Sequence, residues 1–157
     1  MKYAENTSVA VAKSRMEIEQ LVNSAGGTNV LTMALEERSA LVMFTMKDRN
    51  VKFTMPLPAR GDFAKQKVRG WLRTVPAEKQ AKAWEQACRS GWRALLLTIK
   101  AKLISIESKV ETFEEAFLPH IVVVNEGQAV RFGELAVKAI QESYAGGPTR
   151  PLLGSGQ

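Results

Sequence analysis

The sequence predicts an α+β fold: an N-terminal helix, a three-stranded antiparallel meander, a long amphipathic helix, and a C-terminal β-hairpin followed by a helix. Three observations predict this order. Apolar residues recur at helical spacing near the start, three strand-like runs follow between residues 30 and 55, and residues 78–110 repeat apolar positions every three to four residues. A chain of 157 residues fits one domain, which we place at 1–147, with a tail at 148–157.

The first helix is expected to begin at a capping box. Ser14 and Glu17 stand three residues apart, so the hydroxyl and the carboxylate can each satisfy a backbone N–H at the helix start. Helical spacing of apolar residues continues over residues 18–25. The glycine pair at 26–27 supplies the left-handed conformation that commonly ends a helix.

Three runs at residues 30–35, 39–46 and 51–55 are rich in apolar and β-branched side chains, which is typical of strands. Short polar connections separate them, and such connections favour antiparallel pairing of successive strands. Pro56 and Pro58 end the meander because proline cannot donate to a strand ladder.

Residues 59–77 are expected to form a basic loop or linker. A connection of this length is uncommon in a compact domain and usually indicates a functional loop or disorder. Phe63 and Trp71 lie within it, and Asp62 is its one acidic residue. Its basic residues are Arg60, Lys65, Lys67, Arg69 and Arg73.

The long helix predicted over residues 78–110 carries two faces. At about 100° per residue, an apolar stripe and a basic stripe lie roughly a third of a turn apart. The apolar stripe consists of Trp84, Cys88, Trp92, Leu95, Ile99, Leu103, Ile106 and Val110. The basic stripe consists of Lys82, Arg89, Arg93 and Lys100. We expect the first face to pack in the core and the second to meet an acidic partner.

The C-terminal third is predicted to be a short helical turn at residues 113–117, a hairpin and a last helix. The hairpin strands fall at residues 120–124 and 129–132, joined by a turn that contains Gly127. The last helix covers residues 133–144, with apolar residues on one side.

The net charge of +6 is concentrated in one region. Residues 58–110 contain twelve Lys and Arg against four Asp and Glu, whereas residues 111–157 contain three against six. This distribution favours a localised basic surface. The alternative is a long helix that carries surplus cations on a solvated face.

Cellular location follows from what the sequence lacks. There is no run of 18 apolar residues, so we expect no membrane span and no membrane partner. The N-terminus has no apolar signal region, and Cys88 is the lone cysteine, which suits a reducing compartment. We therefore expect a cytoplasmic protein.

Candidates for chemistry are few, and we predict no catalytic residue, metal site or cofactor. His120 beside Pro119 is interpreted as structural, and Cys88 lacks an adjacent activating group. A magnesium-dependent nuclease is a third hypothesis that would need acidic ligands. The candidates for those ligands are Asp48, Asp62, Glu111, Glu114 and Glu115.

The basic residues of the loop and the long helix support nucleic-acid binding. Cations offset phosphate repulsion and release counterions, and an exposed aromatic ring can stack on an unpaired base of single-stranded DNA. The predicted contact residues are Arg60, Lys65, Lys67, Arg69, Trp71, Arg73, Lys82, Arg89, Arg93 and Lys100.

Several segments resemble a family of small proteins encoded in bacteriophage and prophage genomes. They are residues 3–7, 13–15, 17–19, 51–58, 92–103 and 113–121. The resemblance implies a phage context in a bacterial host and carries over no catalytic residue. The order of elements also resembles the core of phage and eukaryotic single-strand annealing proteins, which implies an oligomeric ring with a basic groove and favours DNA over RNA.

The first hypothesis is therefore a non-enzymatic nucleic-acid-binding accessory protein of phage type, acting in DNA recombination, replication or protection. The second hypothesis is a protein–protein interaction module: a phage inhibitor of a host enzyme, or a homo-oligomeric structural protein. In the second case, part of the long apolar stripe serves as an interface.

Overall fold

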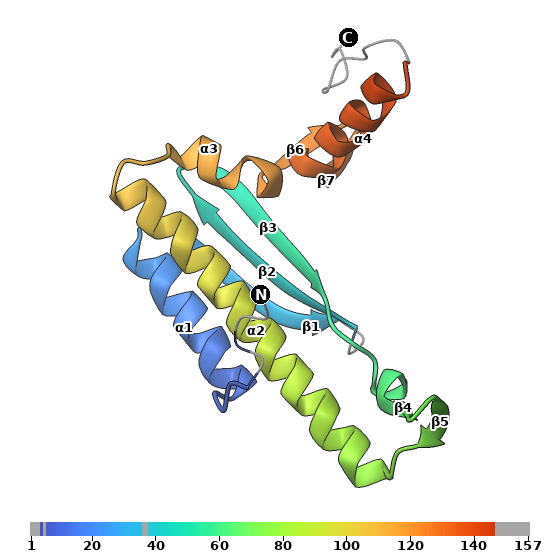
Figure 1. Ribbon diagram of the computed structural model, residues 1–157. Coiled ribbons are helices and arrows are strands. Elements are labelled where there is room, and N and C mark those ends of the chain that lie inside the picture. The colour runs from blue at the N-terminus through green and yellow to red at the C-terminus, as the bar shows by residue number, and fades with distance from the viewer. Residues whose placement is uncertain (1–3, 5, 36–37, 147–157) are drawn as a thin grey trace.

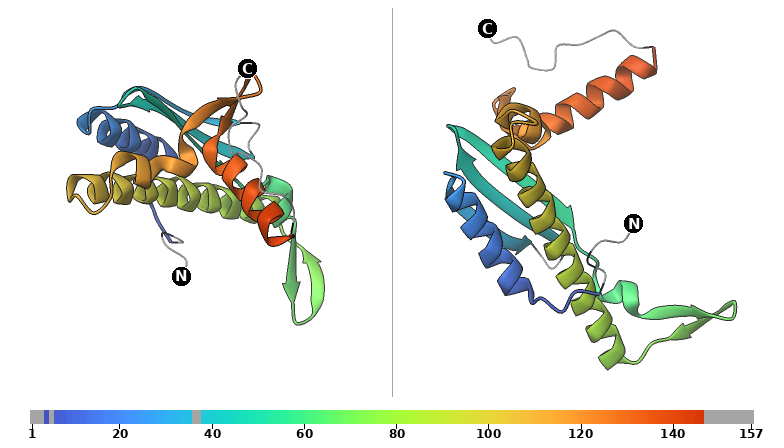
Figure 2. Two further views of the ribbon diagram at one scale, coloured as in Figure 1. Left: turned by 90° about the horizontal axis from the view of Figure 1, so that it is seen from above. Right: turned by 60° about the vertical axis from the view of Figure 1, so that its left-hand side comes forward.

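The computed structural model describes residues 4, 6–35 and 38–146. Two helices lie side by side on one face of a three-stranded sheet, and two smaller units project from the body (Figure 1). One projection follows the last strand of the sheet, and the other is formed by the C-terminal elements (Figure 2). The tail predicted at residues 148–157 lies outside the described residues.

The predicted meander is confirmed. Strands β1 (Thr28–Leu35), β2 (Ser39–Met46) and β3 (Arg49–Pro56) pair antiparallel in the order β1-β2-β3. The turn between β2 and β3 has two residues, Lys47 and Asp48, at φ +48° and +58°. Positive φ at both positions matches the turn whose twist fits a two-residue hairpin.

Helices α1 (Val11–Ser24) and α2 (Ala77–Glu107) cover one face of this sheet. Alternation along β2 directs every second side chain toward them. The core formed between the sheet and these helices includes Ile18, Val22, Ala40, Val42, Phe44, Val51, Phe53, Trp92, Leu96 and Ile99. The apolar stripe of the long helix therefore supplies the core as predicted, from Cys88 to Ile99.

The two ends of the predicted stripe differ from expectation. Trp84 is only partly buried, and Val110 is 75% exposed. Helix α2 ends at Glu107, so Val110 leaves the helical path and does not continue the stripe. The expectation of a core residue at this position is therefore wrong.

The capping box predicted at the first helix is also wrong. Helix α1 begins at Val11, with Ala10 at its N-cap, and Ser14 is fully buried inside the helix. The end of the helix agrees with the prediction. Gly26 adopts φ +86°, and the N–H of Gly27 donates to the carbonyl of Val22 over 2.8 Å.

The interpretation of residues 59–77 as a loop or linker needs correction. The segment contains a 3-10 turn, η1 (Arg60–Phe63), and an antiparallel hairpin of β4 (Lys65–Val68) and β5 (Trp71–Thr74). Arg69 and Gly70 form its two-residue turn at φ +50° and +87°. The hairpin projects from the body beside the start of α2 (Figure 2).

The C-terminal elements appear in the predicted order. They are α3 (Phe113–Phe117), η2 (Leu118–His120), β6 (Val122–Asn125), β7 (Gln128–Arg131) and α4 (Phe132–Tyr144). Helix α3 packs Phe113 and Phe117 into the core, whereas all 13 residues of α4 remain at least partly exposed. Among the described helices, none has the length and apolar character needed to cross a membrane.

Candidate nucleic-acid interface

The ten predicted contact residues fall into two groups. Five belong to the hairpin: Lys65, Lys67, Arg69, Trp71 and Arg73. The other five belong to the turn before it and to α2: Arg60, Lys82, Arg89, Arg93 and Lys100. The structure gives these two groups different surroundings.

All eight strand residues of the β4–β5 hairpin are exposed. The segment from Lys65 to Thr74 contains four cations and no acidic residue. Within the described part of the chain, none of these cations forms an ion pair. Their charge therefore remains available to an external anion.

Apolar side chains accompany the charge at the tip of the hairpin. Trp71 is 77% exposed and Leu72 is 71% exposed. An isolated two-stranded hairpin is only marginally stable in water. The exposed Trp71 and Leu72 side chains do not stabilise this hairpin by burial. Trp71 does not pin the segment to the core, whereas Phe63 at the base is partly buried.

The base of the hairpin is fixed to α2 by Trp84. Its indole Nε1 donates to the carbonyl of Pro58 over 2.9 Å, and the Arg60 guanidinium lies 4.4 Å from its ring centroid. This cation–π contact places Arg60 at the anchor of the hairpin. Gln80 adds a 2.6 Å hydrogen bond to the carbonyl of Val75.

The cations of α2 have partners of their own. Lys82 pairs with Glu78 at 2.6 Å on an exposed helix face. Arg93 pairs with Glu17 of α1 at 2.6 Å, and both side chains are less than one-third exposed. Arg93 therefore joins the two helices, and a phosphate would have to compete with a partly buried carboxylate.

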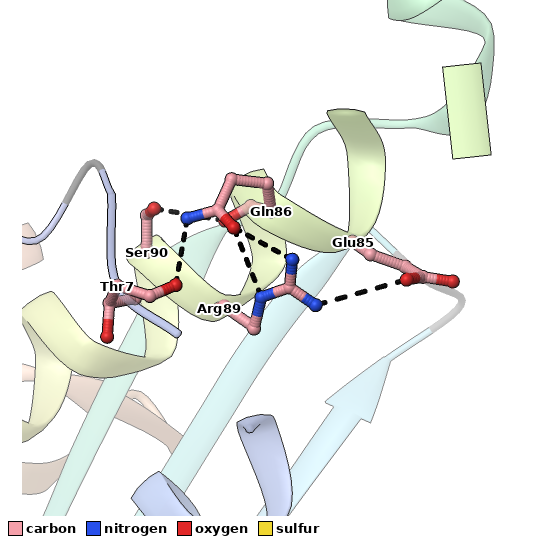
Figure 3. Close-up of polar contacts among 5 residues, drawn as sticks. All are labelled: Thr7, Glu85, Gln86, Arg89 and Ser90. Atoms are coloured by element: carbon pink, nitrogen blue, oxygen red, sulfur yellow. Dashed lines mark hydrogen bonds and ion pairs between the residues drawn. The ribbon is translucent and has the colours of Figure 1, made fainter. Parts of the chain in front are cut away.

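Arg89 lies in a polar cluster that holds the N-terminal segment (Figure 3). Its Nη2 donates to Gln86 Oε1 over 2.7 Å, and its Nη1 lies 3.9 Å from Glu85. Gln86 in turn donates to the backbone carbonyl of Thr7 over 3.0 Å. The guanidinium thus orients the amide that ties the chain before α1 to α2.

Lys100 lies away from the hairpin, further along α2. It borders a cavity of about 560 Å³ between α1, α2 and the end of β2, together with Leu21, Leu103 and Phe113. The predicted basic stripe is therefore not one continuous phosphate track. The hairpin cations form the compact group, and Lys82 is the stripe residue nearest to them along α2.

Three of the five carboxylates considered for magnesium have local roles. Asp62 accepts from the Ala59 N–H, Glu111 accepts from the Ser105 hydroxyl, and Glu115 forms a capping box with Thr112. Hydrogen bonds from the backbone and hydroxyl of Thr112 lower the pKa of Glu115. In the described chain, no three His, Cys, Asp or Glu side chains cluster as a metal site would require.

His120 stacks on Phe53, with ring centroids 3.9 Å apart and planes at 21°. Burial, together with the smaller effect of the positive charges of Lys102 and Arg131, lowers the pKa of His120 to about 4. The imidazole is therefore neutral at pH 7 and packs as an aromatic side chain.

Sequence reasoning missed that Val68 and Leu72 share the hairpin with the cations, and that Trp84 anchors it. The available signal was Gly70, because glycine readily takes the positive φ that a two-residue hairpin turn requires. No protein-family model, no curated protein and no solved structure matches the chain.

Proposed function

We propose that the protein is a non-enzymatic nucleic-acid-binding accessory protein of phage type, with DNA as its partner. It would act in recombination, replication or protection in the cytoplasm of the bacterial host. The observation that supports this proposal best is the projecting β4–β5 hairpin, with four cations that form no ion pair with any described residue, beside the exposed Trp71. Ordered protein surface with this charge and an exposed aromatic ring suits a polyanion that carries flat bases.

A salt-titrated binding series tests the proposal. Labelled single-stranded DNA, duplex DNA and RNA of equal length are titrated with the full chain between about 50 and 200 mM salt. Affinity for at least one DNA form is expected to fall steeply as salt rises. Undetectable binding to all three at the lowest salt contradicts the proposal.

The contribution of the hairpin to binding is measured with two double variants that each remove two lysine charges. K65Q/K67Q is expected to flatten the dependence of log affinity on log salt by nearly two, because each phosphate contact contributes about 0.9 to the slope. K13Q/K109Q removes two exposed lysines from elsewhere and serves as the matched control. Equal effects of the two double variants would mean that net charge, and not the hairpin, drives binding.

A second candidate function, a homo-oligomeric interaction module, is supported by α4. This amphipathic helix leaves Val137 55%, Ile140 56% and Tyr144 92% exposed. Light scattering tests it: an oligomer that I140E dissociates would support an interface on this helix. If the protein is a monomer at all concentrations measured, the hypothesis of self-association through α4 is rejected.

A further inference from the structure

The β4–β5 hairpin carries cations on both of its faces. Residues directly opposite each other in an antiparallel pair share a face, and the register pairs Lys67 with Leu72 and Val68 with Trp71. Since faces alternate along a strand, Lys65 joins Lys67 on one face, and Arg73 joins Trp71 on the other. A ribbon charged in this way suits a site with phosphates on both sides.

The end of the ribbon combines charge with apolar bulk. Arg69 occupies the turn, and Val68, Trp71 and Leu72 flank it with 37%, 77% and 71% exposure. Proteins that enter the minor groove insert apolar side chains between base steps and place arginine in the groove's negative potential. The tip presents both kinds of side chain.

The length of the ribbon is sufficient to reach the bases. Four residues per strand span roughly 13 Å at about 3.3 Å per residue, whereas the minor groove is about 7.5 Å deep and about 6 Å wide, so the ribbon fits only where bending widens the groove. The tip can therefore meet the base stack while Lys65 stays at the level of the phosphates. The hairpin stands clear of the sheet and helices (Figure 2), so the body does not obstruct this approach.

A single-strand site would have a different composition. Such sites align cations along one groove and stack successive bases on several aromatic rings. Here the cations are divided between two faces, and Trp71 is the single aromatic side chain of the hairpin. The arrangement favours a ribbon placed between two backbones.

We infer that β4–β5 enters the minor groove of a DNA duplex and that Trp71, next to the turn, inserts at a base step and bends the duplex. This inference rests on the proposed function and specifies its substrate as duplex DNA. Unstacking a base step is offset by the additional phosphate contacts that the bent duplex offers.

Energy transfer between dyes at the two ends of a duplex of about 30 base pairs measures the bend. The full chain is expected to raise transfer efficiency at saturation. W71A/L72A is expected to bind with the same salt dependence and to lose the increase. The matched control V110A/V124A removes two side chains that are 75% and 74% exposed elsewhere, and should retain both binding and bend.

Two further measurements complete the test. Netropsin, which fills the minor groove, is expected to displace the protein, whereas a ligand confined to the major groove should not. Binding without bending, no displacement by netropsin, or tighter binding to single-stranded DNA of equal length would overturn the inference and leave nucleic-acid binding intact. Absence of binding to every nucleic acid would instead reject the proposed function itself.

Discussion

Arg93 of α2 donates a 2.6 Å hydrogen bond to Glu17 of α1, across 76 positions of sequence. The cation is therefore part of the contact between the two helices that cover the sheet. Glu17 does not cap the first helix as the sequence suggested, because α1 begins at Val11; its carboxylate pairs with Arg93 instead. Glu17 lies in the second turn of α1, where its carboxylate can reach α2.

Removing Arg93 should reduce stability without changing the salt dependence of nucleic-acid binding. Both side chains are less than one-third exposed, so we expect R93A to lower the free energy of unfolding by about 1 kcal/mol. K82A removes an exposed pair within α2 and should cost about 0.3 kcal/mol. Denaturant titration measures both variants, and E17A together with E17A/R93A completes the double-mutant cycle for Glu17 and Arg93. A zero coupling energy would contradict the assigned role of the pair.

The hairpin turn can be tested separately from the domain. Gly70 adopts φ +87°, so G70V should strain the turn and open the hairpin. Because β4 and β5 contribute no side chain to the core, the midpoint of thermal unfolding should stay within a degree or two of wild type. Trypsin should cleave the opened segment faster at its Lys and Arg residues.

G61A is the matched control for the hairpin variant. A Cβ at Gly61 meets no atom within 4 Å, and this residue does not adopt a positive φ. The control should show wild-type cleavage. If G70V lowers the unfolding midpoint by many degrees, the hairpin is coupled to the core more strongly than its exposure indicates.

The sequence predicted the fold well where burial imposes a period. The alternation in β2 and the apolar stripe of α2 exist because those side chains pack against each other, so the pattern is visible without coordinates. The sequence did not predict the β4–β5 hairpin, because this hairpin buries no face. All eight of its strand residues are exposed, so no alternation of apolar and polar side chains records its faces.

The candidate site was predicted from the charge and aromatic content of a segment, without knowledge of which side chains contact each other. Charge and aromatic content were sufficient to find the segment around Trp71. They could not separate Lys67, which has no ion pair among the described residues, from Arg93, whose partner is distant in sequence. Nor could they show that Trp84 anchors the hairpin. The indole of Trp84 donates to the backbone carbonyl of Pro58, and a backbone acceptor cannot be recognised from the pattern of side chains.

Two glycines provide a test of packing at the helices. A Cβ at Gly133 would lie 2.6 Å from the carbonyl oxygen of Pro119, which is backbone and cannot yield easily. A Cβ at Gly91 would lie 3.0 Å from the end of the flexible Met55 side chain. We therefore expect G133A to cost about 1–3 kcal/mol and to loosen the attachment of α4. G91A should be near neutral, because the gain in helix propensity of up to about 1 kcal/mol offsets the contact.

Hydrogen exchange locates the effect of the glycine variants. G133A should raise exchange in β6, β7 and α4 and leave β2 protected. Equal destabilisation by G91A and G133A would show that the difference between a backbone neighbour and a flexible side chain does not govern these sites.

The last prediction concerns acid stability and His120. The folded protein binds a proton at this imidazole with a pKa of about 4, whereas the unfolded chain does so near 6.5. Between these values the unfolded state holds more protons, so the stability contributed by neutral His120 is complete above pH 6.5 and is lost as pH falls toward 4. H120F keeps the ring against Phe53 and should remove this loss. The unfolding midpoint is measured in steps from pH 7 to 5.5, above the range in which the unfolded chain begins to protonate Glu115, whose folded pKa is lowered from the ordinary value of 4.5. A wild-type midpoint that stays flat over this range, or one that falls equally in H120F, would mean that His120 is not held neutral by the fold.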